Sequence, residues 1–257
     1  MPELPEVETL RRGLDDLLKD HPVIRKVRLT RKDIRFEIPK DFARALEGHR
    51  FLGVRRRAKY ILFDTDDAIL LSHLGMTGSW RVAQSGDETI HDHCFIELSD
   101  GRTLVFRDPR RFGVLDLVRR GKESKHKLLD HLGPEPLDET AFDGASLYAM
   151  SRKRKVAVKV FVMNQEVVVG VGNIYASEAL FRAKIRPQKA AGRLTRHECE
   201  RGSSIRDYRQ ASGEAGGFQD AHRVYDRGGE PCVVCRSKIR SKVMGGRSTY
   251  WCSTCQK

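Results

Sequence analysis

Apolar residues recur along this chain with two kinds of spacing, one typical of helices and one typical of strands. The change from one spacing to the other divides the chain into regions. A spacing of three and four near the N-terminus predicts an amphipathic helix that His21 and Pro22 end. The stripe comprises Val7, Leu10, Leu14, Leu17 and Leu18. Short segments of strand character follow at residues 24–30, 34–38, 51–54, 60–64, 68–72, 80–82, 94–98, 103–107 and 114–118. One helix followed by many short strands predicts an antiparallel β-sandwich or barrel.

The pattern becomes helical after Arg119, beyond the stiff connector LGPEPL at residues 132–137. Val156, Val160 and Met163 share one predicted helix face. Asn173 is a candidate cap for a helix that reaches about Lys184. The last 26 residues form a small cysteine-containing module, so the chain is predicted to be an α+β protein with several domains.

Composition narrows the class of protein. The 257 residues include 48 Lys+Arg and 35 Asp+Glu, a formal charge of +13, and 39% are apolar. No apolar run approaches the roughly 18 residues of a membrane helix, and the acidic opening MPELPEVETL does not resemble a signal peptide. We therefore expect a cytoplasmic protein. Its excess positive charge, clustered at residues 55–59, 107–111 and 152–155, favours a polyanionic partner such as nucleic acid.

Four cysteines have the spacing of a metal site. Two C-x-x-C pairs, separated by sixteen residues, provide Cys232, Cys235, Cys252 and Cys255. Each pair can aim two thiolates at one ion, which predicts one structural Zn²⁺ with no open position; a redox dithiol pair is the weaker alternative. Metal binding would supply folding energy to so small a module. Cys94 and Cys199 lack such spacing and are predicted to be ordinary buried thiols.

Two further sites stay ambiguous on spacing alone. Removal of Met1 would leave Pro2 with a free secondary amine, which can form a Schiff base, and Glu3 beside it is a potential proton donor. The same residues equally suit the capped start of a helix. Arg247, beside two glycines between the cysteine pairs, is a potential phosphate contact or simply a solvated surface arginine.

Long ordered motifs across the chain resemble the bacterial formamidopyrimidine-DNA glycosylase family. They are PELPEVET, RRRAKY, SHLGMTGS, DPRRFG, LGPEPL, VVVGVGNIYASEALF and the GEPC…RSTYWC tail. The resemblance implies an N-terminal helix plus antiparallel β-sandwich, a helical domain with a helix–two-turn–helix motif, and a C-terminal zinc-finger β-hairpin. We place these domains at residues 1–131, 132–222 and 223–257.

The resemblance also implies the chemistry: a bifunctional DNA glycosylase/AP lyase that excises 8-oxoguanine and formamidopyrimidines and then cleaves the strand by β,δ-elimination. Pro2 matches the nucleophile and Glu3 the acid/base. Lys59 matches a lysine assigned to β-elimination, and equally suits a phosphate anchor. Arg247 matches the arginine linked to δ-elimination.

Residues that contact DNA are likewise implied by position. They are His91, Arg110, Arg154, Asn173 and, as a pocket lysine, Lys159; Met76, Arg110 and Phe112 match side chains that fill the stack when a nucleotide is extruded. Without the family, Met76 and Phe112 would be assigned to the core. Glu178 matches a family glutamate of open role. The expected partner is duplex DNA with oxidised bases or abasic sites, bound by a monomer in the bacterial nucleoid, with no membrane involved.

The chain departs from the family in three places. Arg154 stands where lysine is common; about one helix is missing near residue 201, which should expose apolar surface; and the damaged-base loop reads SGEAGGF at residues 212–218, with Glu214 in place of a cation. These departures leave two alternatives open. One is an endonuclease VIII-like or AP-site-directed lyase with altered lesion preference, and the other is a non-catalytic protein that binds damaged DNA.

Overall fold

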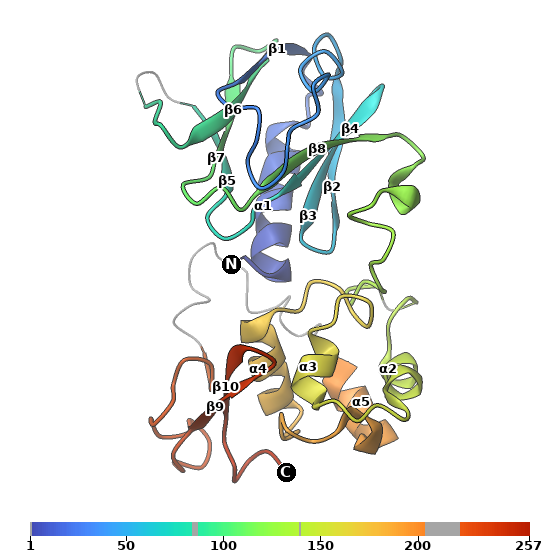
Figure 1. The fold of residues 1–257 in the computed structure, drawn as a ribbon, viewed down its shortest axis with the longest axis vertical. Helices are drawn as coiled ribbons and strands as arrows, with labels where there is room; N and C mark the ends of the chain where they lie inside the picture. Colours follow the sequence, from blue (N-terminus) through green and yellow to red (C-terminus); the bar gives the residue numbers. More distant parts are fainter. Residues whose placement is uncertain (1, 84–86, 139, 204–221) are drawn as a thin grey trace. The chain divides into compact units, whose positions relative to one another are not determined.

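The computed structural model describes residues 2–83, 87–138, 140–203 and 222–257 (Figure 1). The chain forms two compact units, Met1–Asp130 and His131–Lys257. The first unit is built of one helix and two antiparallel sheets, and the second of short helices and a C-terminal hairpin.

The first unit is the predicted β-sandwich. Helix α1 spans Leu4–Leu17 and is joined to strand β2 by a hydrogen bond from the Val54 amide to the Asp15 carboxylate at 2.9 Å. One sheet has the strand order β1-β6-β7-β5 and the other β2-β3-β4-β8, all pairs antiparallel. The strands are β1 Ile24–Leu29, β2 Phe51–Arg57, β3 Tyr60–Thr65, β4 Ala68–His73, β5 Ser79–Val82, β6 Asp92–Leu98, β7 Thr103–Arg107 and β8 Val114–Arg119, followed by the 3₁₀ turn η1 Glu123–Lys125.

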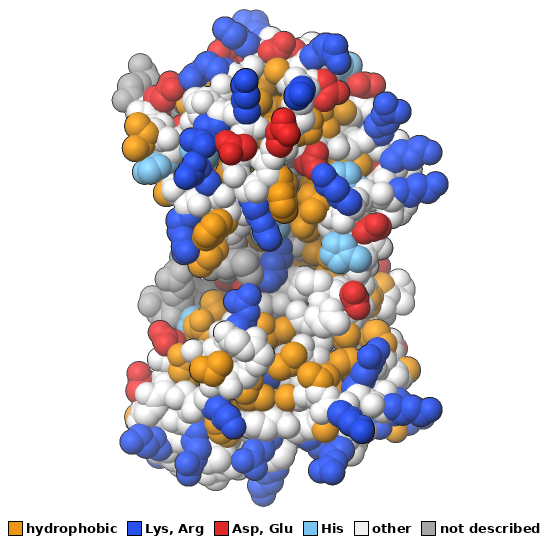
Figure 2. All heavy atoms as spheres, viewed as in Figure 1, with side chains coloured by type: hydrophobic (Ala, Val, Ile, Leu, Met, Phe, Trp, Pro, Cys, Tyr) orange, Lys and Arg blue, Asp and Glu red, His pale blue; other side chains and the backbone are white. Residues whose placement is uncertain are grey.

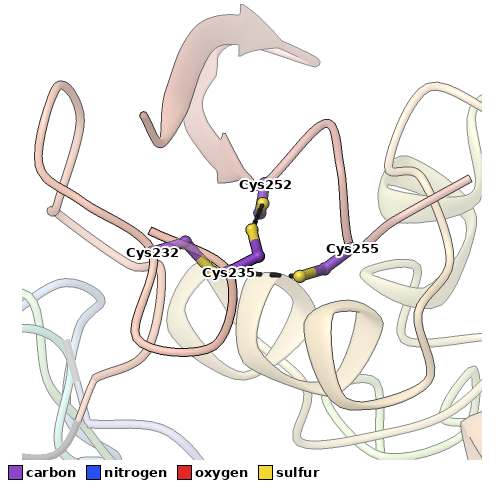
Figure 3. Close-up of side chains that lie close together, drawn as sticks. All are labelled: Cys232, Cys235, Cys252 and Cys255. Carbon is purple, nitrogen blue, oxygen red and sulfur yellow. Dashed lines mark hydrogen bonds between the residues drawn. The ribbon is translucent and has the colours of Figure 1, made fainter. Parts of the chain in front are cut away.

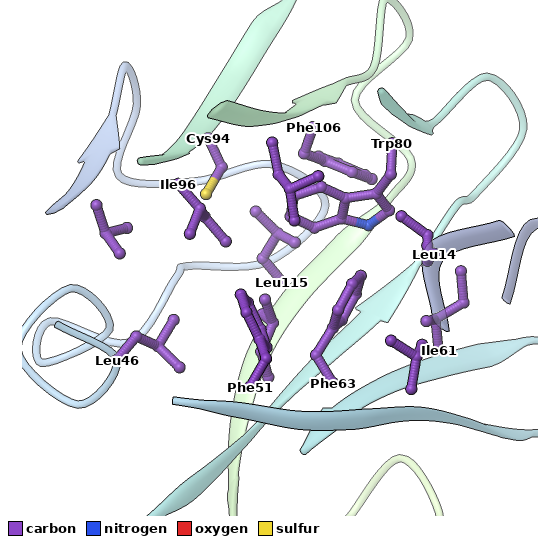
Figure 4. Packing of buried hydrophobic residues seen from close by; sticks show 14 of the residues in the cluster. Leu14, Leu46, Phe51, Ile61, Phe63, Trp80, Cys94, Ile96, Phe106 and Leu115 are labelled. Carbon is purple, nitrogen blue, oxygen red and sulfur yellow. The ribbon is translucent and has the colours of Figure 1, made fainter. Parts of the chain in front are cut away.

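A continuous apolar core fills the space between these sheets (Figure 4). The Trp80 ring lies at its centre, 5.1 Å from the ring of Phe63 and 5.2 Å from that of Phe106. Its indole N–H donates to Ser72 Oγ at 3.0 Å, so the one polar atom of the ring is satisfied. Burying each such ring stabilises the fold by about 2–3 kcal/mol, which gives this unit a stable base for the turns at its edge.

One predicted strand, residues 34–38, is wrong. The segment forms only an isolated bridge between Asp33 and Glu37, and the Ile34 amide donates to the Phe36 carbonyl at 2.9 Å in a tight turn. Ile34 and Ile38 are both buried, because a turn can direct two apolar side chains into the same core. The two apolar residues therefore belong to the core without forming a strand.

The second unit contains the helix–two-turn–helix arrangement, with turns between α3 and α4. Apolar residues from these helices form their own core around Phe161, Tyr175 and Leu180. The elements are α2 Gly144–Ser151, α3 Val158–Val162, α4 Asn173–Arg182, η2 Ala191–Arg193, α5 Arg196–Ser203, β9 Arg240–Met244 and β10 Arg247–Trp251.

Two helix predictions in this unit need correction. The predicted face of Val156, Val160 and Met163 is not the buried one: Val156 is 41% exposed and precedes α3. The short helix instead buries Val158, Phe161 and Val162 together with a lysine. Helix α4 has Gly172 as its N-cap, so Asn173 is its first residue, and it ends at Arg182.

The C-terminal hairpin has little apolar core of its own. Ile239 is buried, but Val243 is 65% exposed, so the apolar residues of the hairpin do not share one buried face. The module packs instead around two of its cysteines and Phe181 of α4. The Gln256 side chain also donates to the Ile185 carbonyl at 2.8 Å. The hairpin is therefore held by its cysteine site and by α4.

Candidate nucleic-acid interface and metal centre

Asp108, which is fully buried just after β7, joins two turns at the edge of the sandwich. Its Oδ1 accepts from the Thr77 hydroxyl at 2.6 Å and its Oδ2 from the Gly113 amide at 2.7 Å. Thr77 Oγ1 in turn accepts from the Arg110 amide at 3.2 Å. One carboxylate thus fixes residues 74–78 against residues 108–113.

The two turns also touch directly through backbone. Gly75 has φ +61°, and a Cβ on it would lie 2.3 Å from the carbonyl carbon of Phe112. Any other residue would force the turns apart, so glycine is required both for its conformation and for space.

These turns present three side chains to solvent, which we call the edge cluster: Met76, Arg110 and Phe112. Met76 is 40% and Phe112 42% exposed, and the Arg110 guanidinium carbon lies 4.9 Å from the Phe112 ring centre. The exposure excludes a core role for the two apolar residues. A flexible thioether, an aromatic ring and a planar cation on a rigid base can replace an extruded base in a duplex.

His91 lies beside the edge cluster. Its carbonyl accepts from the Asp108 amide at 2.9 Å, and the ring of nearby His93 donates through Nε2 to the Asp108 carbonyl at 2.9 Å. The His91 side chain is half-buried. The structure therefore brings together four of the residues predicted to contact DNA.

Lys59 lies in the hairpin between β2 and β3, where Ala58 adopts φ +53°. It is only 7% exposed. Close to it is His73, the last residue of β4, whose ring is 4.9 Å from that of Tyr60. Burial first, and then the charges of Lys59 and Arg35, lower the pKa of His73 to about 4.

The His73 ring is therefore neutral at pH 7, and its hydrogen bonds define the tautomer. Nδ1 accepts from the Gly75 amide at 2.9 Å, so Nε2 carries the proton and is a donor. The sequence predictions did not include His73 or Arg35. The signal for the histidine was its position at a strand end, directly before the SHLGMTGS turn.

The N-terminal pair lies at the start of α1. Glu3 is 2% exposed, its amide donates to the Glu6 carboxylate at 2.9 Å, and the two glutamates form a capping box. Glu8 anchors the next turn to β2 through Arg56 at 3.0 Å. Although burial raises the pKa of Glu8, the bond from Arg56 and neighbouring arginines hold it below its usual range. The start of the helix is thus held firmly, with Pro2 half-buried before it.

Lys159, which matches a pocket lysine of the family, lies in a polar network of the second unit. It is fully buried, and its ammonium donates to Asn173 Oδ1 at 2.6 Å, the Ser248 carbonyl at 3.0 Å and Thr249 Oγ1 at 2.7 Å. Asn173 Nδ2 donates to the same Ser248 carbonyl at 3.0 Å. All three lysine protons are used within the unit, so here Lys159 joins α3, the start of α4 and the hairpin.

Arg154 and Arg247 are both exposed, and each follows a left-handed backbone turn. Lys153 has φ +61°, and Gly245 and Gly246 at the hairpin tip have φ +55° and +73°. Arg247 is the first residue of β10 and directly follows these two glycines.

The four C-terminal cysteines converge on one point (Figure 3). Their sulfur atoms all lie within 4.8 Å of one another, with 3.4 Å between Cys235 and Cys252 and 3.9 Å between Cys232 and Cys255. Four sulfurs around one zinc ion at about 2.3 Å would lie about 3.8 Å apart. The donor set fits one structural zinc ion, as predicted.

The remaining cysteines are buried thiols, as predicted. Burial raises the pKa of Cys94, and burial is also the main cause that raises the pKa of Cys199 to about 11. Both stay protonated at neutral pH and lack the thiolate that reactivity requires.

Two of the sequence departures concern the end of the helical region. The loop SGEAGGF with Glu214 lies outside the described residues. Helix α5 spans Arg196–Ser203 and so runs through residue 201, near which one family helix is predicted to be missing. No large apolar side chain is exposed in the described helices of this unit, so the predicted apolar surface is not found on them. No helix in the described ranges is long and apolar enough to cross a membrane.

Comparisons with known proteins cover the whole chain. Residues 1–115 match the model of the formamidopyrimidine-DNA glycosylase N-terminal domain, residues 132–207 that of its H2TH domain, and residues 229–257 a zinc finger found in FPG and IleRS. The chain is 50% identical to the formamidopyrimidine-DNA glycosylase of Bdellovibrio bacteriovorus and 46% identical to that of Syntrophotalea carbinolica, with complete coverage of each. The first alignment has 273 positions for 257 residues here, so it includes positions without a counterpart in this chain.

Solved structures of formamidopyrimidine-DNA glycosylases are also similar to this chain over nearly its whole length. The MutM (Fpg) protein of Thermus thermophilus is 39% identical with a TM-score of 0.87, covering 99% of this chain and 98% of that one. The enzyme of Lactococcus lactis, non-covalently bound to DNA with an AP site, is 31% identical with a TM-score of 0.90 and 99% coverage of both chains.

Proposed function

The chain belongs to the formamidopyrimidine-DNA glycosylase family and is a DNA repair glycosylase, and we propose that it is bifunctional, excising oxidised purines through a Schiff base on Pro2 and then cleaving the strand. The proposed substrates are 8-oxoguanine and formamidopyrimidines in duplex DNA, processed in the bacterial cytoplasm. The observation that carries the proposal is the buried carboxylate of Glu3 directly after Pro2, which becomes the N-terminal imino acid if Met1 is removed.

The first step is base release. Once Met1 is removed, the Pro2 nitrogen lone pair attacks C1′ of the deoxyribose, and the glycosidic bond breaks with its electron pair going to the base. The departing base takes up the proton that the Pro2 nitrogen loses after forming its bond to C1′. Glu3 donates a proton to O4′ as the C1′–O4′ bond breaks, leaving an iminium ion on Pro2. Its burial keeps bulk water away from the carboxylate, which suits a proton transfer confined to the sugar.

Strand cleavage follows from the iminium ion, which acidifies the protons on C2′. Loss of one of these protons to a base expels the 3′ phosphate by β-elimination, and a second elimination expels the 5′ phosphate. We assign Lys59 to the first elimination or to the phosphate beside it, and Arg247 to the phosphate of the second. Cationic Arg35 and the Nε2–H donor of neutral His73 beside Lys59 favour the phosphate role.

Base chemistry inside a duplex also requires the target nucleotide to leave the stack. The edge cluster supports this step, because Met76 and Phe112 are exposed on a base braced by Asp108. Exposure of two large apolar side chains does not favour folding. It favours DNA binding when these side chains fill the space that an extruded nucleotide leaves.

Borohydride reduction in the presence of a duplex containing 8-oxoguanine tests the proposal. We expect a covalent enzyme–DNA adduct with the wild type and none with Pro2→Gly. The matched control is Pro5→Gly, which changes a proline one turn further along and should still form the adduct. Wild-type binding without any adduct would instead support a damage-binding protein without catalysis.

The lesion preference needs a separate comparison. We expect faster release of 8-oxoguanine and formamidopyrimidine than of oxidised pyrimidines from otherwise identical duplexes. Preferential release of the pyrimidines, or cleavage at abasic sites alone, would overturn the proposed substrate class while leaving the Schiff-base chemistry intact.

A further inference from the structure

A group of exposed cations covers the end of α2, the 3₁₀ turn η2 and the start of α5. We call it the α2–α5 basic surface, and Lys and Arg side chains are visible in that region of Figure 2. It comprises Lys153, Arg154, Lys155, Arg193 and Arg196, all exposed.

These cations are brought together by close backbone packing. The Gly192 amide donates to the Arg154 carbonyl at 2.8 Å, and a Cβ on Gly192 would lie 2.9 Å from that oxygen. Only glycine lets η2 approach the basic run so closely. Two cationic segments about forty residues apart in sequence are thereby held side by side.

The surface is also stiffened from beneath. The guanidinium of Arg152 lies 3.8 Å from the Tyr148 ring centre, and that of Arg196 lies 4.9 Å from it. Arg152 also donates to the Leu194 carbonyl at 2.7 Å, which ties α2 to the start of α5. Holding a guanidinium in place reduces the entropy lost when it binds an anion.

Neighbouring carboxylates do not neutralise these charges. In the described part of the chain, no carboxylate pairs with any of the five cations. Glu198 of α5 accepts from Lys189 at 2.6 Å, and Glu200 lies 3.7 Å from His197. Elsewhere, by contrast, arginines such as Arg55, Arg81 and Arg102 are each paired with an aspartate.

We propose that the α2–α5 basic surface binds the phosphate backbone of duplex DNA that flanks the lesion, and so lengthens the contact beyond the residues that act at the damaged nucleotide. The inference rests on the proposed function, because Arg154, a predicted DNA contact, belongs to the surface. An acidic protein is a poorer fit: Val156 is the one large exposed apolar side chain among the described residues here, whereas protein interfaces need an apolar centre.

Duplex length separates this surface from the lesion site. We compare lesion duplexes of about 12 and about 30 base pairs over a range of salt concentrations, using Lys153→Gln/Arg193→Gln. Both side chains are exposed, so the change should leave the fold intact. The control is Arg119→Gln/Arg120→Gln, an exposed pair on the other unit.

We expect the double variant to bind the long duplex roughly tenfold more weakly and to lower its salt slope by about 1.8, since each phosphate contact adds about 0.9 to the slope. The control should change neither value. Arg196→Gln, as a second variant, should lower the slope by about 0.9, the value for one phosphate contact.

Equal affinity of wild type and variants for the long duplex would contradict DNA binding by the α2–α5 basic surface. An equal loss of affinity for the short and the long duplex would also contradict it, because the cations would then lie at the lesion. If the wild type bound neither duplex, the proposed function would fail as well, whereas normal borohydride trapping without any dependence on length would overturn this inference alone.

Discussion

The two units hold their functional residues by different means. In the first unit, a large apolar core supports turns that a single buried carboxylate, Asp108, locks together. In the second, a buried lysine and four cysteines hold α4 to a hairpin that buries few apolar residues. The first unit should therefore depend on packing and local hydrogen bonds, and the second on its metal and its polar network.

Of the changes considered, removal of the metal should have the largest effect, and it should affect the second unit without affecting the first. Because the C-terminal module has so small a core, loss of zinc by chelation should unfold residues 222–257 and abolish DNA binding. Hydrogen exchange read by mass spectrometry should show lost protection there and unchanged protection in the strands of the first unit. Loss of protection in β2–β4 would contradict independent units.

Within the first unit, Asp108→Ala should be the most damaging single change. It leaves the Thr77 hydroxyl and the Gly113 amide without their acceptor, which should lower the free energy of unfolding by about 3 kcal/mol. Chemical denaturation measures this. Asp100→Ala removes a surface pair with Arg102 and should cost less than about 1 kcal/mol. Similar losses for both would refute the role of Asp108 as the brace.

Acid should weaken the first unit through His73. Its pKa is about 4 in the folded chain and 6.5 ordinarily, so the unfolded state binds the proton first. Stability from this group is therefore complete above pH 6.5 and falls as the pH drops to 4, by about 3 kcal/mol. His73→Gln, which keeps an acceptor for the Gly75 amide, should lose this part of the pH dependence. An unchanged profile would contradict the burial of the neutral ring.

The smallest expected effect concerns the edge cluster itself. Arg110→Ala should leave the fold intact, because its side chain is exposed, while weakening lesion binding and lowering the salt slope by about one unit. Titration of a lesion duplex at several salt concentrations gives the slope. An unaltered slope would mean that Arg110 does not contact phosphate.

The same comparison explains what the sequence could predict. Alternating apolar residues predicted nearly every strand of the sandwich, and the C-x-x-C spacing predicted the cysteine cluster. Residues 34–38 misled because a turn can bury two isoleucines as well as a strand can.

The surroundings of several site residues depend on tertiary contacts, which local sequence spacing does not predict. Lys159 carries no local sign that Asn173, Ser248 and Thr249 will surround it, since its partners lie up to ninety residues away. His73 likewise owes its low pKa to neighbours from other segments. Spacing alone left Met76 and Phe112 in the core, and only the family resemblance placed them at the surface where the structure has them.

The most direct test is to locate the covalent bond. The borohydride-trapped complex should be digested and the peptide that carries the deoxyribose remnant sequenced by tandem mass spectrometry. We expect the remnant on the nitrogen of Pro2, in a peptide that no longer contains Met1. A remnant on the side chain of Lys59, or an active enzyme that retains Met1, would contradict the proposed chemistry.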